Sequence, residues 1–207
     1  MAALRPSDGL FEQVAAYTDE AMSVVTGEDL SAPTPCSQWN LLELMRHLST
    51  SLGVLIQTLQ DGRPDLLGAV RCATGTRPYT ADLLLAGDVG TVLATAVRYR
   101  TERLVRVHEA LRRGEGPDNV LVGERPLPRD LVAAAGAVEL AVHSWDIATA
   151  CGRILPIPDA PAVELLELSA LVVDGVGRLG LFASAVAVPP RTPPGDRLVA
   201  LLGRTPA

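Results

Sequence analysis

Lysine is absent from this chain of 207 residues, and all 18 of its basic residues are arginines. The arginines are dispersed, with no basic block beyond the pair Arg112 and Arg113, and the formal net charge is −6. A protein that binds nucleic acid needs clustered cations to displace counterions from the phosphates. The charge pattern therefore argues against a nucleic-acid partner.

Cysteines and long apolar runs are also scarce. Cys36, Cys72 and Cys151 are widely spaced and form no CxxC pair, so they do not indicate a disulfide framework. The N-terminus lacks a basic stretch followed by an apolar segment of signal-peptide length. No uninterrupted apolar run is long enough to span a bilayer. We therefore expect a cytoplasmic protein with reduced thiols and no membrane partner.

Aromatic residues make up 3% of the chain although 48% of it is hydrophobic, so the core must consist mainly of Leu, Val and Ala. This mixture favours helices. Apolar periodicity and capping residues predict an all-α protein with helices after Ser7 up to Gly27 and over residues 40–60, 88–113, 129–150, 159–174 and 196–203.

The segments between these helices are predicted to be loops, with one short turn over residues 81–86. Residues 120–122 are expected to form a brief extended segment that Pro126 and Pro128 then break. The sequence shows no internal repeat and no long linker. We therefore predict a single domain over residues 1–207, with a core bundle over about 7–152 and a helical extension over about 153–207.

The helix predicted over residues 129–150 contains the residues most indicative of chemistry. Glu139 is the one acid between Leu131 and Trp145, and it precedes His143 by four residues. This spacing places both side chains on one helix face, where both reach a common point. A buried carboxylate is normally paired or bound to a metal. The spacing alone leaves two interpretations open, a metal site or a simple hydrogen-bonded pair.

Two further motifs accompany the one that contains this pair. Residues 34–40 read Thr-Pro-Cys-Ser-Gln-Trp-Asn, residues 44–48 read Leu-Met-Arg-His-Leu, and residues 139–146 read Glu-Leu-Ala-Val-His-Ser-Trp-Asp. With the ending over residues 194–204, they resemble the actinobacterial DinB/YfiT-like metal-binding family. That family includes the N-terminal domain of mycothiol-dependent maleylpyruvate isomerase, and the chain resembles its single-domain members.

The resemblance implies a four-helix bundle with additional short C-terminal helices. It also implies a divalent metal, most often zinc with nickel or iron as options, held by His47, Glu139 and His143. Relatives use such a site to activate a low-molecular-weight thiol such as mycothiol. The chain departs from its relatives at Ser144, where Gly is common, and we expect it to be without the isomerase's additional C-terminal domain.

Three functions remain open at this point. The first is a metal-dependent thiol transferase or isomerase that acts on a small-molecule substrate. The second is a tailoring enzyme of secondary metabolism that uses the metal as a Lewis acid without a thiol. The third is a non-catalytic module that binds a metal or a small ligand. We expect the protein to be a monomer or a homodimer.

Four other residues have more peripheral predicted roles, and a fifth is expected outside the site. Trp39, Trp145 and Arg98 are candidates for substrate binding, although packing and ordinary surface charge are the alternatives. Asp146 is a candidate to orient a ligand imidazole by a hydrogen bond, or else a surface charge. His108 lies among charged residues, so we expect it on a solvated helix face outside the site.

Overall fold

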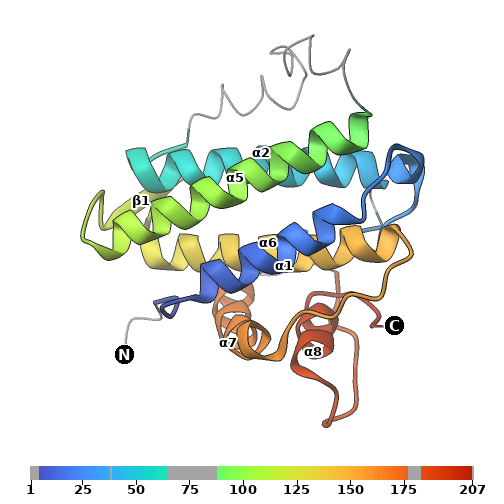
Figure 1. Cartoon of the computed structure of the whole chain (residues 1–207). Coiled ribbons are helices and arrows are strands. Elements are labelled where there is room, and N and C mark those ends of the chain that lie inside the picture. The colour runs from blue at the N-terminus through green and yellow to red at the C-terminus, as the bar shows by residue number, and fades with distance from the viewer. Residues whose placement is uncertain (1–4, 38, 65–87, 177–182, 207) are drawn as a thin grey trace.

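The structure is a computed structural model, and it describes residues 5–37, 39–64, 88–176 and 183–206 (Figure 1). Four long helices form its main body, namely α1 (Leu10–Ser23), α2 (Leu41–Asp61), α5 (Val89–Arg112) and α6 (Arg129–Ala150). α2 lies beside α5 and α6, and α1 lies beside the same two helices. The predicted all-α four-helix bundle is confirmed.

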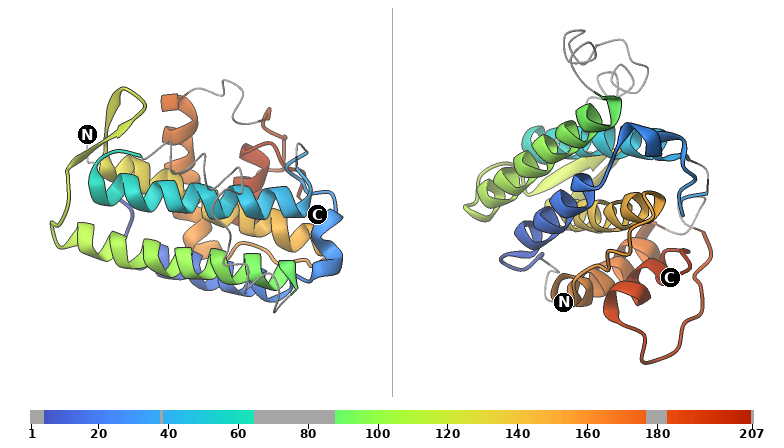
Figure 2. Two further views of the ribbon diagram at one scale, coloured as in Figure 1. Left: turned by 90° about the horizontal axis from the view of Figure 1, so that it is seen from above. Right: turned by 45° about the vertical axis from the view of Figure 1, so that its right-hand side comes forward.

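Two further helices lie against the bundle on the side of α6. α7 (Asp159–Val176) packs against α6, and α8 (Pro194–Leu201) packs against α7 (Figure 2). They correspond to the predicted fifth and closing helices, with bounds that differ by about two residues. The predicted turn over residues 81–86 and the loop cysteine Cys72 lie outside the described residues.

The start of α2 follows the sequence closely. Asn40 Oδ1 accepts a hydrogen bond from the Glu43 backbone N–H, and the Glu43 carboxylate accepts one from the Asn40 N–H, each at 3.0 Å. This reciprocal pair satisfies two backbone donors that a helix start leaves free. It fixes where α2 begins, and therefore where His47 lies two turns later.

The first helix begins and ends differently from the prediction. Ser7 is not its N-cap, because Gly9 occupies that position and the Ser7 hydroxyl donates a hydrogen bond to Glu164 of α7. α1 also ends at Ser23, and a short 3₁₀ helix, η1 (Gly27–Ser31), follows it. The N-terminal segment is thus tied to α7 by a contact that local sequence does not reveal.

A small β-hairpin precedes α6. Strand β1 (Asn119–Val122) pairs antiparallel with β2 (Arg125–Pro128), and Gly123 makes the turn with a φ of +61°. The expectation that Pro126 and Pro128 break this segment was wrong, since both lie in β2. In a two-stranded sheet each strand has a free edge, so the missing N–H of proline is tolerated.

α6 is the central helix of the fold. Fourteen of its residues are buried. Within the described residues it is the one helix long and apolar enough to cross a membrane, but 78% of that apolar stretch is buried inside the protein. Burial on several sides is expected for a helix that packs against α1, α2 and α7.

Ser144 shows what the departure from Gly does at this position of α6. Its hydroxyl is fully buried, 2.7 Å from the Leu140 carbonyl oxygen and 2.9 Å from Thr18 Oγ1 on α1. The Thr18 hydroxyl in turn donates to the Val14 carbonyl. A polar group at this position is therefore satisfied, and it links α6 to α1.

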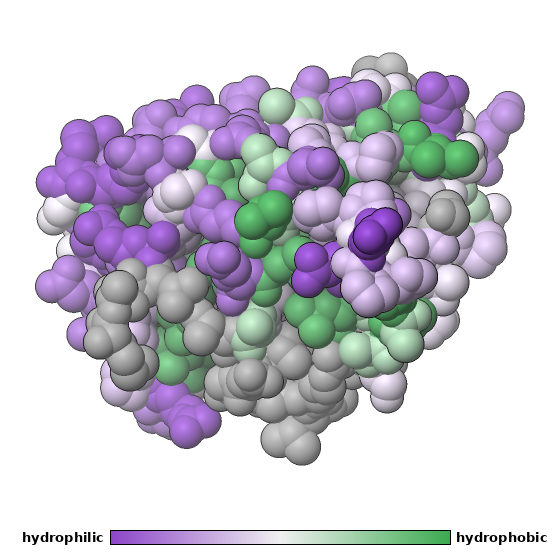
Figure 3. Space-filling model, turned by 90° about the horizontal axis from the view of Figure 1, so that it is seen from below, coloured by the Kyte–Doolittle hydropathy of each residue, from purple (hydrophilic) through white to green (hydrophobic). Residues whose placement is uncertain are grey.

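One face of the molecule mixes polar and apolar surface. Seen from below, polar side chains cover its left and upper parts, and apolar side chains lie toward its middle (Figure 3). The large hydrophobic residues exposed in the described parts of the chain include Ile154 and Val163, at 87% and 50% exposure. The prediction of a monomer or homodimer stays a prediction.

Candidate metal centre

The candidate site lies where α2 and α6 pack against each other. The rings of His47 and His143 are in contact, and Ser51 hydrogen-bonds Glu139. The Leu55 side chain lies against Gly136, where a Cβ atom would be. Residue numbers rise along α2 while they fall along α6, so the two helices run antiparallel. We call this contact line the α2–α6 seam, defined by His47, Ser51 and Leu55 on α2 and by Gly136, Glu139 and His143 on α6.

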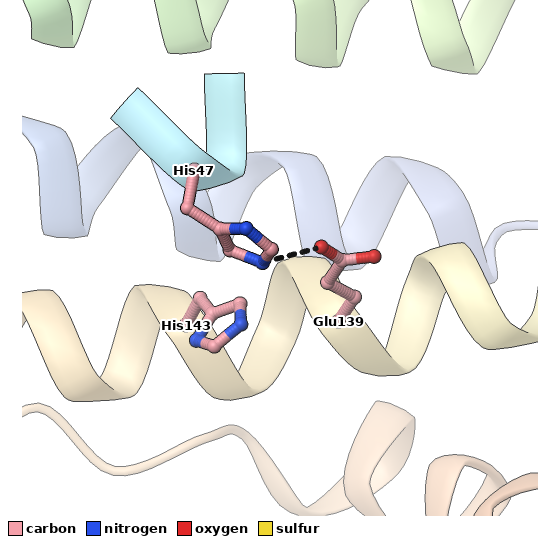
Figure 4. A group of neighbouring side chains, drawn as sticks. All are labelled: His47, Glu139 and His143. Carbon is pink, nitrogen blue, oxygen red and sulfur yellow. Dashed lines mark ion pairs between the residues drawn. The ribbon is translucent and has the colours of Figure 1, made fainter. Parts of the chain in front are cut away.

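Three side chains converge at one end of the seam (Figure 4). His47 Nε2 lies 3.3 Å from Glu139 Oε1, and the imidazole rings of His47 and His143 meet edge to face with centroids 5.4 Å apart. One ligand atom from each of the three residues lies within 4.8 Å of the others. Spacing predicted the Glu139 and His143 pair, and the structure adds His47 as the resemblance implied.

Exposure differs among the three residues. The side chains of His47 and Glu139 are 35% and 32% exposed, whereas that of His143 is 11% exposed. The cluster is therefore anchored in the protein on the His143 side and accessible to solvent on the other.

On the side away from Glu139 and His47, the His143 ring contacts Asp146, which lies one turn further along α6. His143 Nδ1 lies 3.0 Å from Asp146 Oδ2, and Asp146 is fully buried. When Nδ1 carries the proton, it donates to the carboxylate and leaves the lone pair on Nε2. Asp146 is therefore not a surface charge but a buried partner of His143, and its role in orienting a metal ligand stays a prediction.

Both carboxylates are biased toward the ionised form. Burial by itself would raise the pKa of Glu139, but hydrogen bonds from His47 and Ser51 and the two histidines' charges outweigh it, so the pKa lies below its usual range. Burial likewise would raise the pKa of Asp146, but hydrogen bonds from His143 and Arg204 hold that pKa low. Each side chain is an anion at neutral pH.

The connector before α2 brings Trp39 to the cluster. The Thr34 hydroxyl lies 2.7 Å from the Trp39 carbonyl oxygen and 3.0 Å from that of Cys36, and the Trp39 N–H donates to the Cys36 carbonyl. These bonds fold the connector into a compact turn. Trp39 consequently lies over His47, with ring centroids 4.2 Å apart. Of the predicted substrate-binding residues, Trp39 is the one that reaches the cluster.

Trp145 and Arg98 lie elsewhere. Trp145 is two residues beyond His143, on the opposite side of α6, and it is 6% exposed within the core. Arg98 projects from α5 and pairs with Asp19 of α1 at 2.6 Å. Among the described residues, no hydrogen bond or ion pair connects either of them to the cluster.

His108 was placed incorrectly by sequence reasoning. It is 5% exposed rather than solvated, and its ring stacks on Phe11 with centroids 4.1 Å apart. Burial lowers its pKa, so the neutral form is favoured. The expectation that it lies outside the metal cluster agrees with this position at the α1–α5 contact.

Two residues near the site were missed. Ser51 follows His47 by four residues on α2 and hydrogen-bonds Glu139, and this helical spacing was a signal that could have found it. Arg204 donates from Nε to Asp146 Oδ1 at 3.2 Å and from Nη2 to Oδ2 at 2.8 Å. No spacing rule connects Arg204 to a residue on a distant helix.

The donor set and its spacing fit a divalent metal ion. Zinc binds imidazole nitrogens and carboxylate oxygens at about 2.0–2.1 Å, so two ligand atoms of a tetrahedral site lie about 3.3 Å apart. The separation between His47 Nε2 and Glu139 Oε1 is 3.3 Å. Pairs as far apart as the 4.8 Å limit would have to close by about 1.5 Å when a metal binds.

The fold and the cluster together define a class of protein, a DinB-like helical bundle with a possible His/Glu/His metal site between two of its helices. The family model described as mycothiol maleylpyruvate isomerase N-terminal domain matches residues 11–148. This range is most of the chain, and the chain belongs to that family. The predicted family membership is confirmed.

Two relatives are uncharacterized proteins of Mycobacterium tuberculosis, from strains H37Rv and CDC 1551. Each is 26% identical to this chain over 185 residues, which covers 87% of this chain and 88% of the relative. No solved structure shows a significant match. The relatives extend the similarity beyond the matched family segment, toward the C-terminal helices.

Proposed function

We propose that His47, Glu139 and His143 bind one divalent metal ion, and that the protein uses it to activate a low-molecular-weight thiol for S-transfer or isomerisation. The observation that carries the proposal is the convergence of two imidazoles and one carboxylate within 4.8 Å. Zinc suits this set best, and nickel or iron would accept the same donors. Membership in a family named for a mycothiol-dependent enzyme supports a mycothiol-like thiol as cosubstrate.

The charge of the site supports an anionic ligand. Glu139 contributes the single negative charge of the ligand set, so it compensates only half the charge of a divalent ion. When bound, the metal would supply the Lewis acidity that lowers the pKa of a thiol or polarises a carbonyl. Three protein ligands leave at least one coordination position for such a group.

The surrounding residues have distinct roles in this proposal. Asp146 holds His143 in the orientation and tautomer that present Nε2. Trp39 covers His47 and offers an aromatic surface against which a small substrate packs. His47 and Glu139, each about one-third exposed, form the solvent-facing side through which thiol and substrate enter.

The first test is the metal content of the purified protein after loading under reducing conditions. We expect one metal ion per chain in the wild type and loss of that ion in His143→Ala. His108→Gln is the matched control, because His108 is buried against Phe11 rather than in the cluster, and it should keep the metal. A wild type without stoichiometric metal would refute the proposal.

The second test concerns the thiol. We expect mycothiol to bind the zinc-loaded wild type, measured by titration calorimetry, and not to bind His143→Ala. A metal-loaded wild type that neither binds mycothiol nor conjugates it to an electrophile would refute the thiol part alone. The metal site would then stand, and Lewis-acid chemistry without a thiol would become the better explanation.

A further inference from the structure

Arg204 forms the outer end of a hydrogen-bonded chain that reaches the candidate metal cluster. Its guanidinium donates to both oxygens of Asp146, and Asp146 accepts from His143 Nδ1 through the oxygen that also receives Arg204 Nη2. The third nitrogen, Nη1, donates to the Leu202 carbonyl at 2.9 Å. The guanidinium is therefore fixed at both ends.

The Asp146 carboxylate has few other ways to be held in place. It is fully buried, and a buried carboxylate requires both compensating charge and hydrogen bonds. Arg204 is itself only 9% exposed, and its planar fork matches the carboxylate in a two-bond arrangement. Such an arrangement sets the plane of the carboxylate as well as its position, and the plane sets the direction in which it accepts from His143.

The fold delivers Arg204 to this position by a sharp turn after α8. Gly203 has a φ of +87°, a conformation that L side chains rarely adopt, and a Cβ there would lie 2.6 Å from Ala183 Cβ. The Arg204 N–H donates to the Val199 carbonyl at 2.9 Å, which closes the turn. Leu198, Val199 and Leu202 are buried and anchor α8.

We propose that Arg204 is a positioning residue for the metal site, which acts through Asp146 to fix the ring orientation and tautomer of His143. The inference rests on the proposed metal-binding function. It assigns a role at the site to the segment after α8, which lies outside the family-matched residues 11–148. Among the described residues, Arg204 and His143 are the two that hydrogen-bond the Asp146 carboxylate. Without the two bonds from Arg204, only the bond from His143 would remain to orient the carboxylate plane.

The test compares zinc affinity, measured by competition with a chromophoric chelator, in the wild type and three variants. Loss of a partner that supports a metal-ligating histidine typically weakens metal binding 10–100-fold, and we expect a loss of about this size for Arg204→Gln. Arg204→Lys keeps the charge but not the two-bond fork, so it should lose less, about 3–10-fold.

Arg129→Gln is the matched control. Arg129 is another arginine with little exposure, at 12%, and it donates to the Leu111 carbonyl at the opposite end of the bundle. It begins α6, about 21 Å along the helix axis from His143. The variant should lower the melting temperature and leave zinc affinity unchanged, which separates general destabilisation from positioning.

The visible absorption spectrum of the cobalt-substituted protein gives a second readout, because its bands respond to ligand geometry. We expect shifted bands in Arg204→Gln, a partial return toward the wild-type spectrum in Arg204→Lys, and none of these changes in Arg129→Gln. If Arg204→Gln does not fold, the test rests on Arg204→Lys alone. A zinc affinity and a cobalt spectrum of Arg204→Lys equal to those of Arg129→Gln would then overturn the proposal.

The two proposals fail in different ways. A wild type that binds zinc, together with an Arg204→Gln variant that binds it equally well, overturns the role of Arg204 and leaves the metal site intact. A wild type that binds no zinc refutes the metal site, and the role assigned to Arg204 falls with it.

Discussion

Gly136 allows α2 and α6 to approach closely along the seam that carries the candidate ligands. A Cβ at this position would lie 2.1 Å from Leu55 Cδ2, whereas carbon atoms in contact are separated by about 3.5–4.0 Å. Gly136→Ala therefore requires the Leu55 methyl group to move by about 1.5 Å. Leu55 is only partly buried, so it has room to rotate, but at a cost.

Two opposing contributions set the magnitude. Overpacking costs about 1–3 kcal/mol, and replacing a helical glycine by alanine contributes about 1 kcal/mol in favour of folding. We expect Gly136→Ala to lower the free energy of unfolding by about 1 kcal/mol. In a Leu55→Ala background the clash is absent, so the same substitution should raise it by about 1 kcal/mol. The coupling between the two positions is then about 2 kcal/mol.

Urea denaturation followed by circular dichroism measures all four proteins of this cycle. Gly53→Ala is the matched control, since it is also a helical glycine but its Cβ would meet Arg100 at an ordinary 3.5 Å. It should stabilise the protein by about 1 kcal/mol in either background. If Gly136→Ala changes the free energy of unfolding equally in the wild-type and Leu55→Ala backgrounds, the close approach of the helices is refuted.

Two further predictions follow from local features. Asn40→Ala removes the N-cap of α2 and should lower the free energy of unfolding by about 1 kcal/mol in the same denaturation assay, with an unchanged value contradicting the capping role. Burial, followed by the nearby Asp29 carboxylate, raises the pKa of Cys151 to about 11. The thiolate fraction of Cys151 at pH 8 is then about 0.1%. We therefore expect alkylation of Cys151, mapped by peptide mass spectrometry, to be slow at pH 8 and to accelerate up to about pH 11. Rapid alkylation of Cys151 at pH 8 would contradict the burial.

Local signals in the sequence predicted much of the fold and part of the site. The periodic apolar residues predicted the long helices, and the Asn40 and Glu43 pair marked the start of α2. The spacing of Glu139 and His143 predicted their common face, since helical geometry is decided within one turn. His47 came from the family resemblance, because no rule of spacing relates residues on different helices.

The errors share a physical cause. His108 has charged neighbours along the chain, but its burial depends on Phe11 from another helix. Pro126 and Pro128 disfavour central strands, but a two-stranded hairpin has only edges. Arg204 belongs to the ending over residues 194–204 that resembles the family, but nothing in that local pattern indicates its partner Asp146, which lies on a different element. Each of these depends on how the residue's segment pairs or packs with another segment, which periodicity and residue propensity do not encode.

The close ring contact between Trp39 and His47 has an optical consequence. The chain has only two tryptophans, and they lie in contrasting environments, since Trp145 is enclosed in the core while Trp39 lies 4.2 Å from an imidazole of the cluster. Indole emission responds to charge and contact at such short range. We therefore expect the intrinsic fluorescence of Trp39 to respond to events at His47, and replacement of Trp145 by phenylalanine would leave Trp39 as the single tryptophan beside the three tyrosines.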